Sequence, residues 1–573
     1  MMTIARFIPA LSWLKTYNRG QFSQDATAAF IVTMLLIPQS LAYAMLAGVP
    51  PEVGLYSSIL PLVLYALFGT STSLSVGPVA VASLMTATSL AVIAEQGTAS
   101  YLTGAITLAL LSGAMLVIMG VMKLGMVTNL LSHSVISGFI SASGIIIALS
   151  QLKHILGIQA HGDNVVTQLL SMLENIDQFK PITFVIGVSV IAFLLLARRH
   201  AKRFLITLKV PEASAASLAK TAPILGVLSS LAVVYLYDLQ SHGVAITGHI
   251  PAGLPNLGFS LPSMELVKEL ALPALMISII GYVESISVGK TLGAKRREKV
   301  KPNQELIGLG AANIASGVSG GFPVTGGFSR SVVNFDAGAV TQLASIMTAL
   351  GIMIASLLLT PMLYFLPKAT LAATIIVAVT TLIDFSILKK TWQFSRSDFY
   401  AVLATIVITL LLGVEVGVAS GVALSIALHL YRTSKPHVAE VGLIKGSEHF
   451  RNVKRYEVET SPQLLCLRPD ESLFFANATF LEDHIIDTIS QRKEINHVVI
   501  QCSAVNEIDF SALEMLEALN LQLKSLNIKL SLSEVKGPVM DHLECSGFLH
   551  HLNGKVYLSQ FQAFKDITQA SDS

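Results

Sequence analysis

The sequence predicts an α-helical protein that crosses the membrane many times and ends in a small α/β domain. Hydrophobic residues make up 53% of the 573 residues and charged residues only 13%, about half of the roughly 25% found in ordinary soluble domains. Long apolar runs recur from residue 28 to residue 432. After the segment 431–436 the composition changes to that of a soluble domain. Lipid is therefore the expected solvent of the first three-quarters of the chain.

The apolar runs give the number of membrane segments. Taking ~20 residues as a full span and allowing half-length pieces, we count about fourteen segments. An even count places both ends of the membrane part on the same side. The long runs cover residues 28–47, 53–68, 101–122, 181–197, 269–289, 343–366 and 397–413.

Two clusters of basic residues predict the orientation. Residues 221–267 between them contain no Lys or Arg. Because cytoplasmic loops carry the excess of Lys and Arg, we expect 198–220 and 290–304 in the cytoplasm and 239–265 outside. Counting spans outward from these loops then puts both termini in the cytoplasm. The clusters are Arg198, Arg199, Lys202, Arg203 and Lys209, and Lys290, Lys295, Arg296, Arg297, Lys299 and Lys301.

The chain is expected to divide into a membrane domain, 1–433, and a cytoplasmic domain, 434–573. Strands alternate with helices in the second part, which predicts a small α/β domain with a mainly covered sheet. At roughly 130 residues it can hold its own core. The predicted strands are 464–467, 498–502 and 528–532, and the predicted helices are 480–491, 510–526 and 539–543.

Cysteines, charge and motifs limit the classes of function. Cys466, Cys502 and Cys545 are scattered without metal-like spacing and read as reduced cytosolic residues. The net charge of +2 by itself argues neither for nor against a nucleic-acid partner, and we expect none. No nucleophile–base set or metal cluster stands out. We therefore expect no enzyme activity, no catalytic residues, no cofactor and no metal site.

Two apolar segments interrupted by glycine and proline, 75–83 and 320–331, occupy corresponding places in the two halves of the membrane part. Irregular backbone is tolerated in a membrane only where protein buries it or water reaches it. Two such segments are typical of transporters built from inverted repeats, with the substrate between them. In the alternative interpretation, the glycines only allow close packing of helices.

Each interrupted segment contains residues that suit the start of a half-helix, whose first N–H groups lack partners and carry a partial positive charge. Proline is tolerated in a first helical turn and glycine allows an irregular approach. Two such N-termini that face each other would form an anion site. The residues are Gly77, Pro78 and Val79 in the first segment and Thr325, Gly326 and Gly327 in the second, followed by Phe328 and Ser329.

Charged and polar side chains in apolar spans add to this site. Arg330 follows the second segment, and a guanidinium near the membrane centre costs about 2.5–3.5 kcal/mol, so it should face a cavity. Glu284 lies deep in another apolar span, where a carboxylate exchanges protons or pairs with a cation. A structural Glu284–Arg330 ion pair is the alternative. Gln39 and Tyr43, one turn apart, either line the same cavity or bond to neighbouring helices.

At these residues the chain resembles the SulP/SLC26 anion transporter family, over nearly its whole length. The C-terminal part resembles the STAS domain of that family, with 508–512 at a strand-to-helix turn. The matching motifs are Ile37-Pro-Gln-Ser-Leu-Ala-Tyr-Ala-Met-Leu-Ala-Gly48, Pro50-Pro-Glu-Val-Gly-Leu-Tyr-Ser-Ser58, Phe68-Gly-Thr-Ser71, Leu74-Ser-Val-Gly-Pro-Val-Ala80, Asn303-Gln-Glu-Leu306 with Gly308, Gly310 and Asn313, and Phe322-Pro-Val-Thr-Gly-Gly-Phe-Ser-Arg-Ser-Val-Val-Asn334.

The resemblance implies fourteen segments in a seven-plus-seven inverted repeat, divided into a core that carries the substrate and a gate that forms a homodimer scaffold. It implies transport by an elevator-like movement of the core against the gate. It places the site between the third and tenth segments. The substrate-binding residues would be Gln39, Tyr43, Gly77, Pro78, Val79, Gly326, Gly327, Phe328, Ser329 and Arg330.

The chain also departs from the family pattern. Where sodium-coupled bicarbonate members carry an acid and two hydroxyl-bearing residues, this chain has Glu284 with Val288 and Phe328. Hard cations want several oxygen ligands, so proton coupling through Glu284 is favoured over sodium. In soluble STAS relatives a phosphorylatable serine follows the aspartate, whereas here Phe510 follows Asp509 and Ser511 comes one place later.

We therefore expect a proton-coupled transporter of a small anion in a bacterial inner membrane. Sulfate is the first candidate, a C4-dicarboxylate such as succinate the second, and bicarbonate the third. A cytoplasmic regulator acting through the STAS domain is a further expected partner, although the domain could serve only folding, dimerisation or delivery. An anion channel or exchanger and a membrane-anchored signalling protein are the alternatives.

Overall fold

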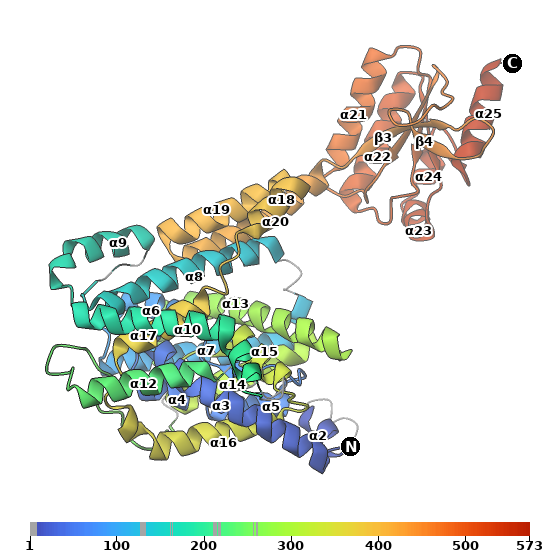
Figure 1. The fold of residues 1–573 in the computed structure, drawn as a ribbon. Coiled ribbons are helices and arrows are strands. Elements are labelled where there is room, and N and C mark those ends of the chain that lie inside the picture. Colours follow the sequence, from blue (N-terminus) through green and yellow to red (C-terminus); the bar gives the residue numbers. More distant parts are fainter. Residues whose placement is uncertain are drawn as a thin grey trace. The chain divides into compact units, whose positions relative to one another are not determined.

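The chain folds into two compact units, Met1–Ser425 and Ile426–Ser573, coloured blue to orange and orange to red in Figure 1. They meet inside helix α20 (Val414–Ser434). The boundary predicted from the sequence, 433/434, lies at the far end of that helix and stays a prediction. The computed structural model describes residues 8–572 apart from 127–132, 161, 163, 210–214, 216–218, 220, 256 and 259–261.

The first unit is built from helices and one pair of very short strands. Its described elements are α2 (Ala10–Leu14), α3 (Arg19–Ala47), α4 (Pro51–Tyr56), α5 (Leu60–Phe68), β1 (Val76–Gly77), α6 (Ala80–Ala91), α7 (Ala99–Val121), α8 (His133–Leu156), α9 (Val165–Glu174), η2 (Ile176–Gln178), α10 (Pro181–Thr207), α12 (Ala222–Leu236), α13 (Met264–Arg296), α14 (Pro302–Val318), β2 (Thr325–Gly326), α15 (Phe328–Asp336), α16 (Leu343–Leu358), η3 (Thr360–Leu363), α17 (Lys368–Val379), α18 (Ser386–Phe394), α19 (Arg396–Leu412) and the first part of α20.

Several helices are long and apolar enough to span a membrane. In the described part these are Arg19–Ala47, Pro51–Phe68 (α4 and α5 together, joined by a turn), Ala99–Val121, Ser134–Leu156, Pro181–Thr207 and Met264–Arg296, and five shorter apolar helices accompany them. The predicted run 343–366 is not one helix, because α16 ends at Leu358 and a 3₁₀ turn containing Pro361 follows. A proline cannot continue the helical hydrogen-bond ladder. The prediction of a helical membrane part is confirmed.

The helices of the first unit pack in two groups. In one, α14 packs against α5 and α7, and α13 packs against α7. In the other, α8 packs against α17 and α19, and α10 packs against α17. Helix α3 contacts α17 of the second group, and it contacts α6 and α15, both of which pack against α13 of the first group. A site beside α3 therefore lies where the two groups meet.

Two fully buried carboxylates fix segments that are far apart in the sequence. Asp25 on α3 accepts hydrogen bonds from the backbone N–H groups of Val340 and Thr341, at 2.6 and 3.1 Å, just before α16. Glu305 on α14 accepts from the Tyr65 hydroxyl at 2.7 Å and from the Thr70 N–H at 2.6 Å. Buried carboxylates are tolerated only with such partners. These contacts hold the segments that lead into β1 and out of α15.

The second unit is the expected α/β domain, with a six-stranded sheet in the order β4-β3-β5-β6-β7-β8. The pairs from β5 to β8 are parallel, and β3 pairs antiparallel with both β4 and β5. The elements are β3 (Val438–Leu443), β4 (Phe450–Asn452), β5 (Leu464–Pro469), α21 (Ala478–Gln491), β6 (His497–Gln501), α22 (Phe510–Ser525), β7 (Lys529–Ser533), α23 (Gly537–Cys545), α24 (Phe548–His551), β8 (Val556–Tyr557) and α25 (Gln560–Asp572).

Both faces of this sheet are covered, as predicted. Alternate residues of β5 point to opposite faces. Leu465 belongs to a core with α21, α22 and α23, whereas Cys466 packs in a core with α25. The three strands and three helices predicted from the sequence are confirmed to within a few residues, while β3, β4, β8, α24 and α25 were not predicted.

The two buried cysteines are chemically protected. Cys466 and Cys502 are 3% and 4% exposed, and burial raises the pKa of each thiol to about 12. Since the thiolate is the reactive form, both remain unreactive thiols at neutral pH. No disulfide joins any of the three cysteines.

Candidate functional site

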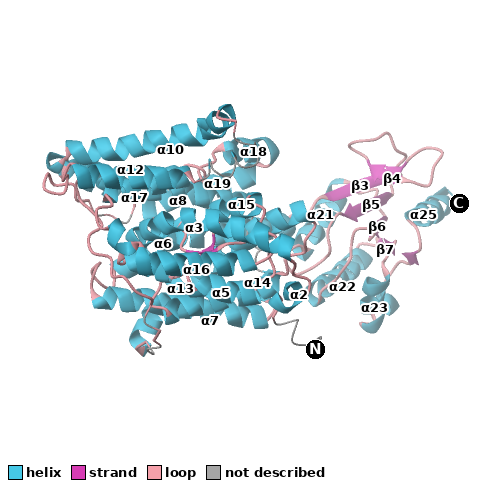
Figure 2. Ribbon diagram, turned by 60° about the horizontal axis from the view of Figure 1, so that its bottom comes forward, coloured by secondary structure: helices cyan, strands magenta, loops and turns pink. Residues whose placement is uncertain are grey.

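The two interrupted segments meet in the interior of the first unit. Strand β1 pairs antiparallel with β2, with Val76 opposite Gly326 and Gly77 opposite Thr325. Figure 2 shows this pair as a short magenta segment surrounded by helices. The pairing continues past the strands, because the Gly327 N–H donates to the Ser75 carbonyl at 3.3 Å. Segments from the two halves of the chain thus form one antiparallel crossing.

Side chains from neighbouring helices satisfy the backbone of the second segment. Asn313 on α14 accepts from the Val324 N–H at 2.9 Å and donates to the Val324 carbonyl at 2.8 Å. Ser285 on α13 accepts from the Gly326 N–H at 2.8 Å, and the Thr325 hydroxyl donates to the Gly281 carbonyl at 2.6 Å. Non-helical backbone inside a membrane protein requires such partners. Side-chain hydrogen bonds therefore stabilise the crossing in the interior of the unit.

A helix begins directly after each strand. Val79 is the N-cap of α6 and Gly327 is the N-cap of α15, and neither helix has a side-chain cap. The first N–H groups of both helices consequently lack the usual capping acceptor. The positive ends of two helix dipoles lie at the crossing, which favours an anion there.

Arg330, in the first turn of α15, folds back onto the crossing. A Cβ atom added to Gly77 would lie 2.8 Å from its Nη1, and one added to Gly327 would lie 3.1 Å from its Nε. The residue is only 2% exposed, yet neither Nη1 nor Nη2 has a hydrogen-bond partner. The predicted alternative of a structural Glu284–Arg330 ion pair therefore finds no direct contact. A buried, unpartnered guanidinium is costly unless a ligand completes it.

A small cavity of about 40 Å³ adjoins this guanidinium. Phe328 is 47% exposed and Ser329 is also exposed, so the cavity lies beside an exposed part of α15. Gln39 and Tyr43 come from α3, and Glu284 from α13. The lining residues are Gln39, Tyr43, Val79, Ala80, Val81, Glu284, Gly327, Phe328, Ser329, Arg330, Ala378, Val379, Thr381 and Leu382.

The structure brings most of the predicted site residues together. Gly77, Pro78 and Gly326 do not line the cavity and instead form or flank the strand pair behind it. The sequence did not predict the C-terminal end of α17 and the residues just after it, among which Val379 and Thr381 line the cavity. No charge or motif marks that apolar stretch, and only the packing of α17 against α3 brings it to the site.

The site offers poor ligands for a hard cation. Val288 is 5% exposed and lies outside the cavity lining, while Phe328 contributes no side-chain oxygen. Among the described residues, no group of three or more His, Cys, Asp or Glu could hold a metal ion. Glu284 is the one carboxylate among the described residues that line this cavity.

A Gly77→Ala substitution is expected to weaken anion binding by about 10-fold or more. The new methyl group would push against the far end of the Arg330 side chain, and the backbone of Gly77, with φ +159°, would be strained by any side chain. Both effects disturb the contact of Arg330 with the crossing, and a shift of about 1 Å at a charged contact is worth up to two orders of magnitude. Titration of the purified protein with sulfate checks this. Gly289→Ala on α13 is the matched control, because its added Cβ meets only ordinary contacts at 3.7 Å. Unchanged affinity in Gly77→Ala would contradict the placement of Arg330.

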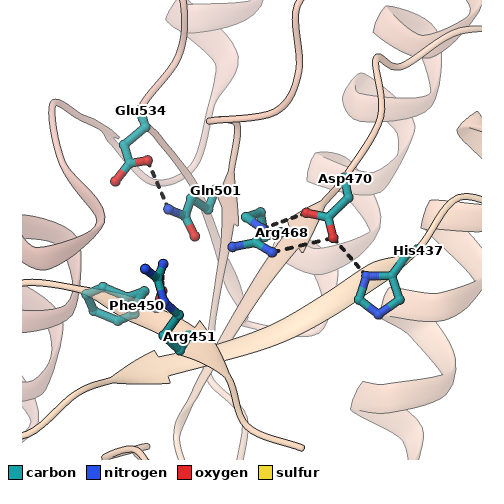
Figure 3. A network of polar contacts seen from close by, with 7 residues as sticks. All are labelled: His437, Phe450, Arg451, Arg468, Asp470, Gln501 and Glu534. Atoms are coloured by element: carbon teal, nitrogen blue, oxygen red, sulfur yellow. Dashed lines mark hydrogen bonds and ion pairs between the residues drawn. The ribbon is translucent and has the colours of Figure 1, made fainter. Parts of the chain in front are cut away.

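The second unit carries a separate polar cluster, drawn in Figure 3. Asp470 accepts a 2.6 Å hydrogen bond from Arg468 Nε, and its other oxygen lies 2.8 Å from His437 Nδ1. Although partial burial opposes it, hydrogen bonds and charges from Arg468 and His437 lower the pKa of Asp470. Arg451 and Arg455 line the same pocket, of about 520 Å³, so its described lining carries more positive than negative charge.

The turn before α22 retains an accessible hydroxyl. Asp509 is the N-cap of α22 and accepts from the Ala512 N–H at 2.9 Å. Phe510, at the position where soluble relatives carry the serine, is 71% exposed. Ser511 is exposed in the first helical turn, where a phosphate would meet the positive end of the dipole.

Comparisons with known proteins show the family to which the chain belongs. The sulfate permease family matches residues 22–405, and the STAS domain matches residues 455–563. Sulfate transporter 4.1, chloroplastic, of Arabidopsis thaliana is 36% identical over 568 residues, covering 97% of this chain and 81% of that protein. A probable sulfate transporter of Mycobacterium tuberculosis is 32% identical over 550 residues, covering 96% of this chain and 95% of that protein.

Solved structures share the fold. The murine Solute Carrier 26 family member A9 anion transporter in the inward-facing state matches with a TM-score of 0.91 at 23% identity, covering 100% of this chain and 95% of that chain. The transmembrane domain of a cyanobacterium bicarbonate transporter matches with a TM-score of 0.61 at 21% identity, covering 70% of this chain and 98% of that chain. At these identities the likeness concerns the fold alone.

The resemblance stated from the sequence is confirmed, and with it the multi-pass membrane class. The family and these curated relatives are transporters rather than enzymes. Because the family match spans most of the chain and the relatives exceed 30% identity across most of both lengths, the chain belongs to the sulfate permease family, with a C-terminal STAS domain.

Proposed function

We propose that this protein is a secondary active transporter that moves a small dianionic oxyanion, sulfate first, across the membrane together with protons. The observation that carries the proposal is that the buried guanidinium of Arg330 has two nitrogens without hydrogen-bond partners. It lies at the place where α6 and α15 begin. A tetrahedral oxyanion has several acceptor oxygens that suit a guanidinium fork and free N–H groups. The names of the curated relatives support sulfate.

Proton coupling is proposed through Glu284. This carboxyl lines the same cavity as Arg330. In the empty site an ionised Glu284 balances Arg330 through space. A bound dianion neutralises the charge of Arg330 in place of Glu284, and it repels Glu284 as long as that carboxylate is ionised. Binding of the anion therefore favours binding of a proton to Glu284, and binding of the proton favours binding of the anion. The poor ligand set for a hard cation supports protons over sodium.

An elevator-like movement is proposed for the transport step. The cavity is lined by residues of α3, α6, α13 and α15 and by residues at and just after the end of α17. Since α17 packs with α8 and α10 while α13 packs with α7, the site lies between two helix groups. Sliding one group against the other would expose the site alternately to the two sides. We propose the α8–α10–α17–α19 group as the gate and homodimer scaffold.

Location and regulation belong to the same proposal. We place the protein in a bacterial inner membrane with both termini in the cytoplasm, following the distribution of basic residues. The STAS unit would then meet cytoplasmic regulators. Its arginine-lined pocket and the exposed Ser511 support such a role, since both suit charged or phosphate-bearing groups.

Uptake into proteoliposomes tests the proposal. Labelled sulfate, succinate and bicarbonate are supplied with an inward proton gradient, an inward sodium gradient, or neither. We expect saturable sulfate uptake that the proton gradient accelerates and the sodium gradient does not. Preferred uptake of succinate would assign the site to a C4-dicarboxylate, which carries the same two charges. Currents that never saturate with substrate would contradict a transporter and favour a channel.

A further inference from the structure

Two adjoining pockets lie at one end of the first unit, near the end of α8 and the start of α17. Their volumes are about 450 and 660 Å³, and both are lined by Lys153, His154 and Lys368. The larger pocket also includes Gly243 and Ala245. These two residues belong to the loop 239–265, which the charge pattern places outside the cell. We call the two pockets together the outer vestibule.

The outer vestibule lies in line with the central cavity along three helices. On α3 its lining starts at Met45, two residues beyond Tyr43 of the central cavity. On α6 it starts at Leu84, three residues beyond Val81. On α17 it includes Leu371, two turns before Ala378 of the central cavity. The linings of the outer vestibule and of the central cavity therefore follow one another along the same three helices.

The lining of the outer vestibule is basic. Lys153, Lys180 and Lys368 contribute three ammonium groups, and no Asp or Glu is among the described residues that line either pocket. Two of the lysines also have local structural roles. Lys153 donates to the Ala160 carbonyl at 3.2 Å, and Lys180 donates to the Gly243 carbonyl at 3.0 Å.

Lys368 differs from the other two lysines because no local structural role explains its ammonium group. It is the first residue of α17, where the positive end of the helix dipole disfavours a cation. Among the described residues none forms an ion pair or a side-chain hydrogen bond with its ammonium group, although it lines both pockets. The helix start and the ammonium group repel each other, and both attract an anion. Lys153, by contrast, lies in the last turn of α8, where a cation is favourable.

We propose that the outer vestibule is a staging site that collects the dianionic substrate from outside and passes it to Arg330. This inference rests on the proposed function. A pocket lined by one sign of charge raises the local concentration of a counter-ion and its association rate by about 10–1,000-fold, and salt screens the effect. The central site sets affinity and turnover, and the vestibule sets how readily outside substrate reaches it.

Initial rates of labelled sulfate uptake by intact cells test the staging site. We expect Lys368→Gln to raise the outside KM about 5-fold at low ionic strength and less than about 2-fold near 0.5 M salt, with kcat unchanged. Lys368→Arg should keep the wild-type KM because it keeps the charge. Lys268→Gln is the matched control, since Lys268 is exposed near the start of α13 and lines neither pocket.

Efflux from preloaded cells shows whether the variant still folds and transports. It reaches the central site from the opposite side, so Lys368→Gln should leave the efflux KM unchanged. Equal outside KM values and equal salt dependence in Lys368→Gln, Lys268→Gln and wild type would overturn the staging site while leaving transport intact. Absence of any dianion uptake by the wild type would instead refute the proposed function, and the staging site with it.

Discussion

Replacing Arg330 by alanine is expected to weaken sulfate binding by about 100-fold or more without destabilising the empty protein. Truncating one partner of a buried charge pair costs about 2–5 kcal/mol, and 1.4 kcal/mol corresponds to a tenfold change in Kd. In the empty protein, however, the terminal nitrogens of Arg330 lack partners at 2% exposure. Removing a buried group with unsatisfied hydrogen-bonding capacity takes away that cost, and Glu284, left without the positive charge of Arg330, becomes neutral by binding a proton. Loss of binding and retention of stability should therefore occur together.

Thermal unfolding of purified protein with and without sulfate measures both effects. Wild-type protein at 100 times its Kd gains about 2.7 kcal/mol of stability from the ligand, whereas Arg330→Ala should gain almost nothing at the same concentration. Arg330→Lys keeps the charge but loses the planar fork, so an intermediate gain is expected. Arg19→Ala, at the exposed start of α3, is the control. A full sulfate-induced shift in Arg330→Ala would refute the anion site.

Glu284→Gln is expected to abolish acceleration by a proton gradient while sulfate still binds and exchanges. The amide resembles the protonated carboxyl in shape and charge, so the site stays permanently in its anion-binding form. Repulsion is what couples the two ions in the wild type. Two like unit charges 4 Å apart cost about 4 kcal/mol at an effective dielectric constant of 20, and a dianion raises that cost. Without a titrating group this linkage disappears.

Two transport modes separate coupling from binding. Sulfate–sulfate exchange at equal pH should persist in Glu284→Gln, and net uptake should no longer respond to the proton gradient. Glu269→Gln is the matched control, because Glu269 lies on the same helix α13 but is exposed and away from the cavity. Undiminished acceleration by protons in Glu284→Gln would assign coupling to another group. Loss of exchange as well would show that Glu284 is needed for binding itself.

Local patterns were sufficient for much of the fold. Apolar runs predicted α3, α7, α10 and α13 because a span of lipid requires a continuous apolar helix. The strands β5, β6 and β7 were predicted because buried parallel strands are short, uninterrupted apolar segments. In contrast, β8 has two residues and β4 has three, too few for a pattern. Their pairing partners, rather than their own side chains, make them strands.

Individual residues of the candidate site were predicted from the sequence, but the contacts that bring them together were not. The interrupted segments, Arg330 and Glu284 stood out because irregular backbone and charge are unusual in an apolar span. Asp25 and Glu305 did not stand out as anchors, since their partners lie more than 200 residues away in the chain. The contribution of α17 was also missed, because its lining residues carry no chemical mark.

By itself the sequence determined the solvent of each part, the two places where helices are broken, and the side chains that could meet an anion or a proton. Those features depend on residue types within a few positions of each other. Only the tertiary structure decided that β1 and β2 cross, that Arg330 folds back between Gly77 and Gly327 without a partner, and that the lysines of the outer vestibule lie in line with the cavity. Such contacts join residues far apart in the sequence, and packing of whole helices fixes them.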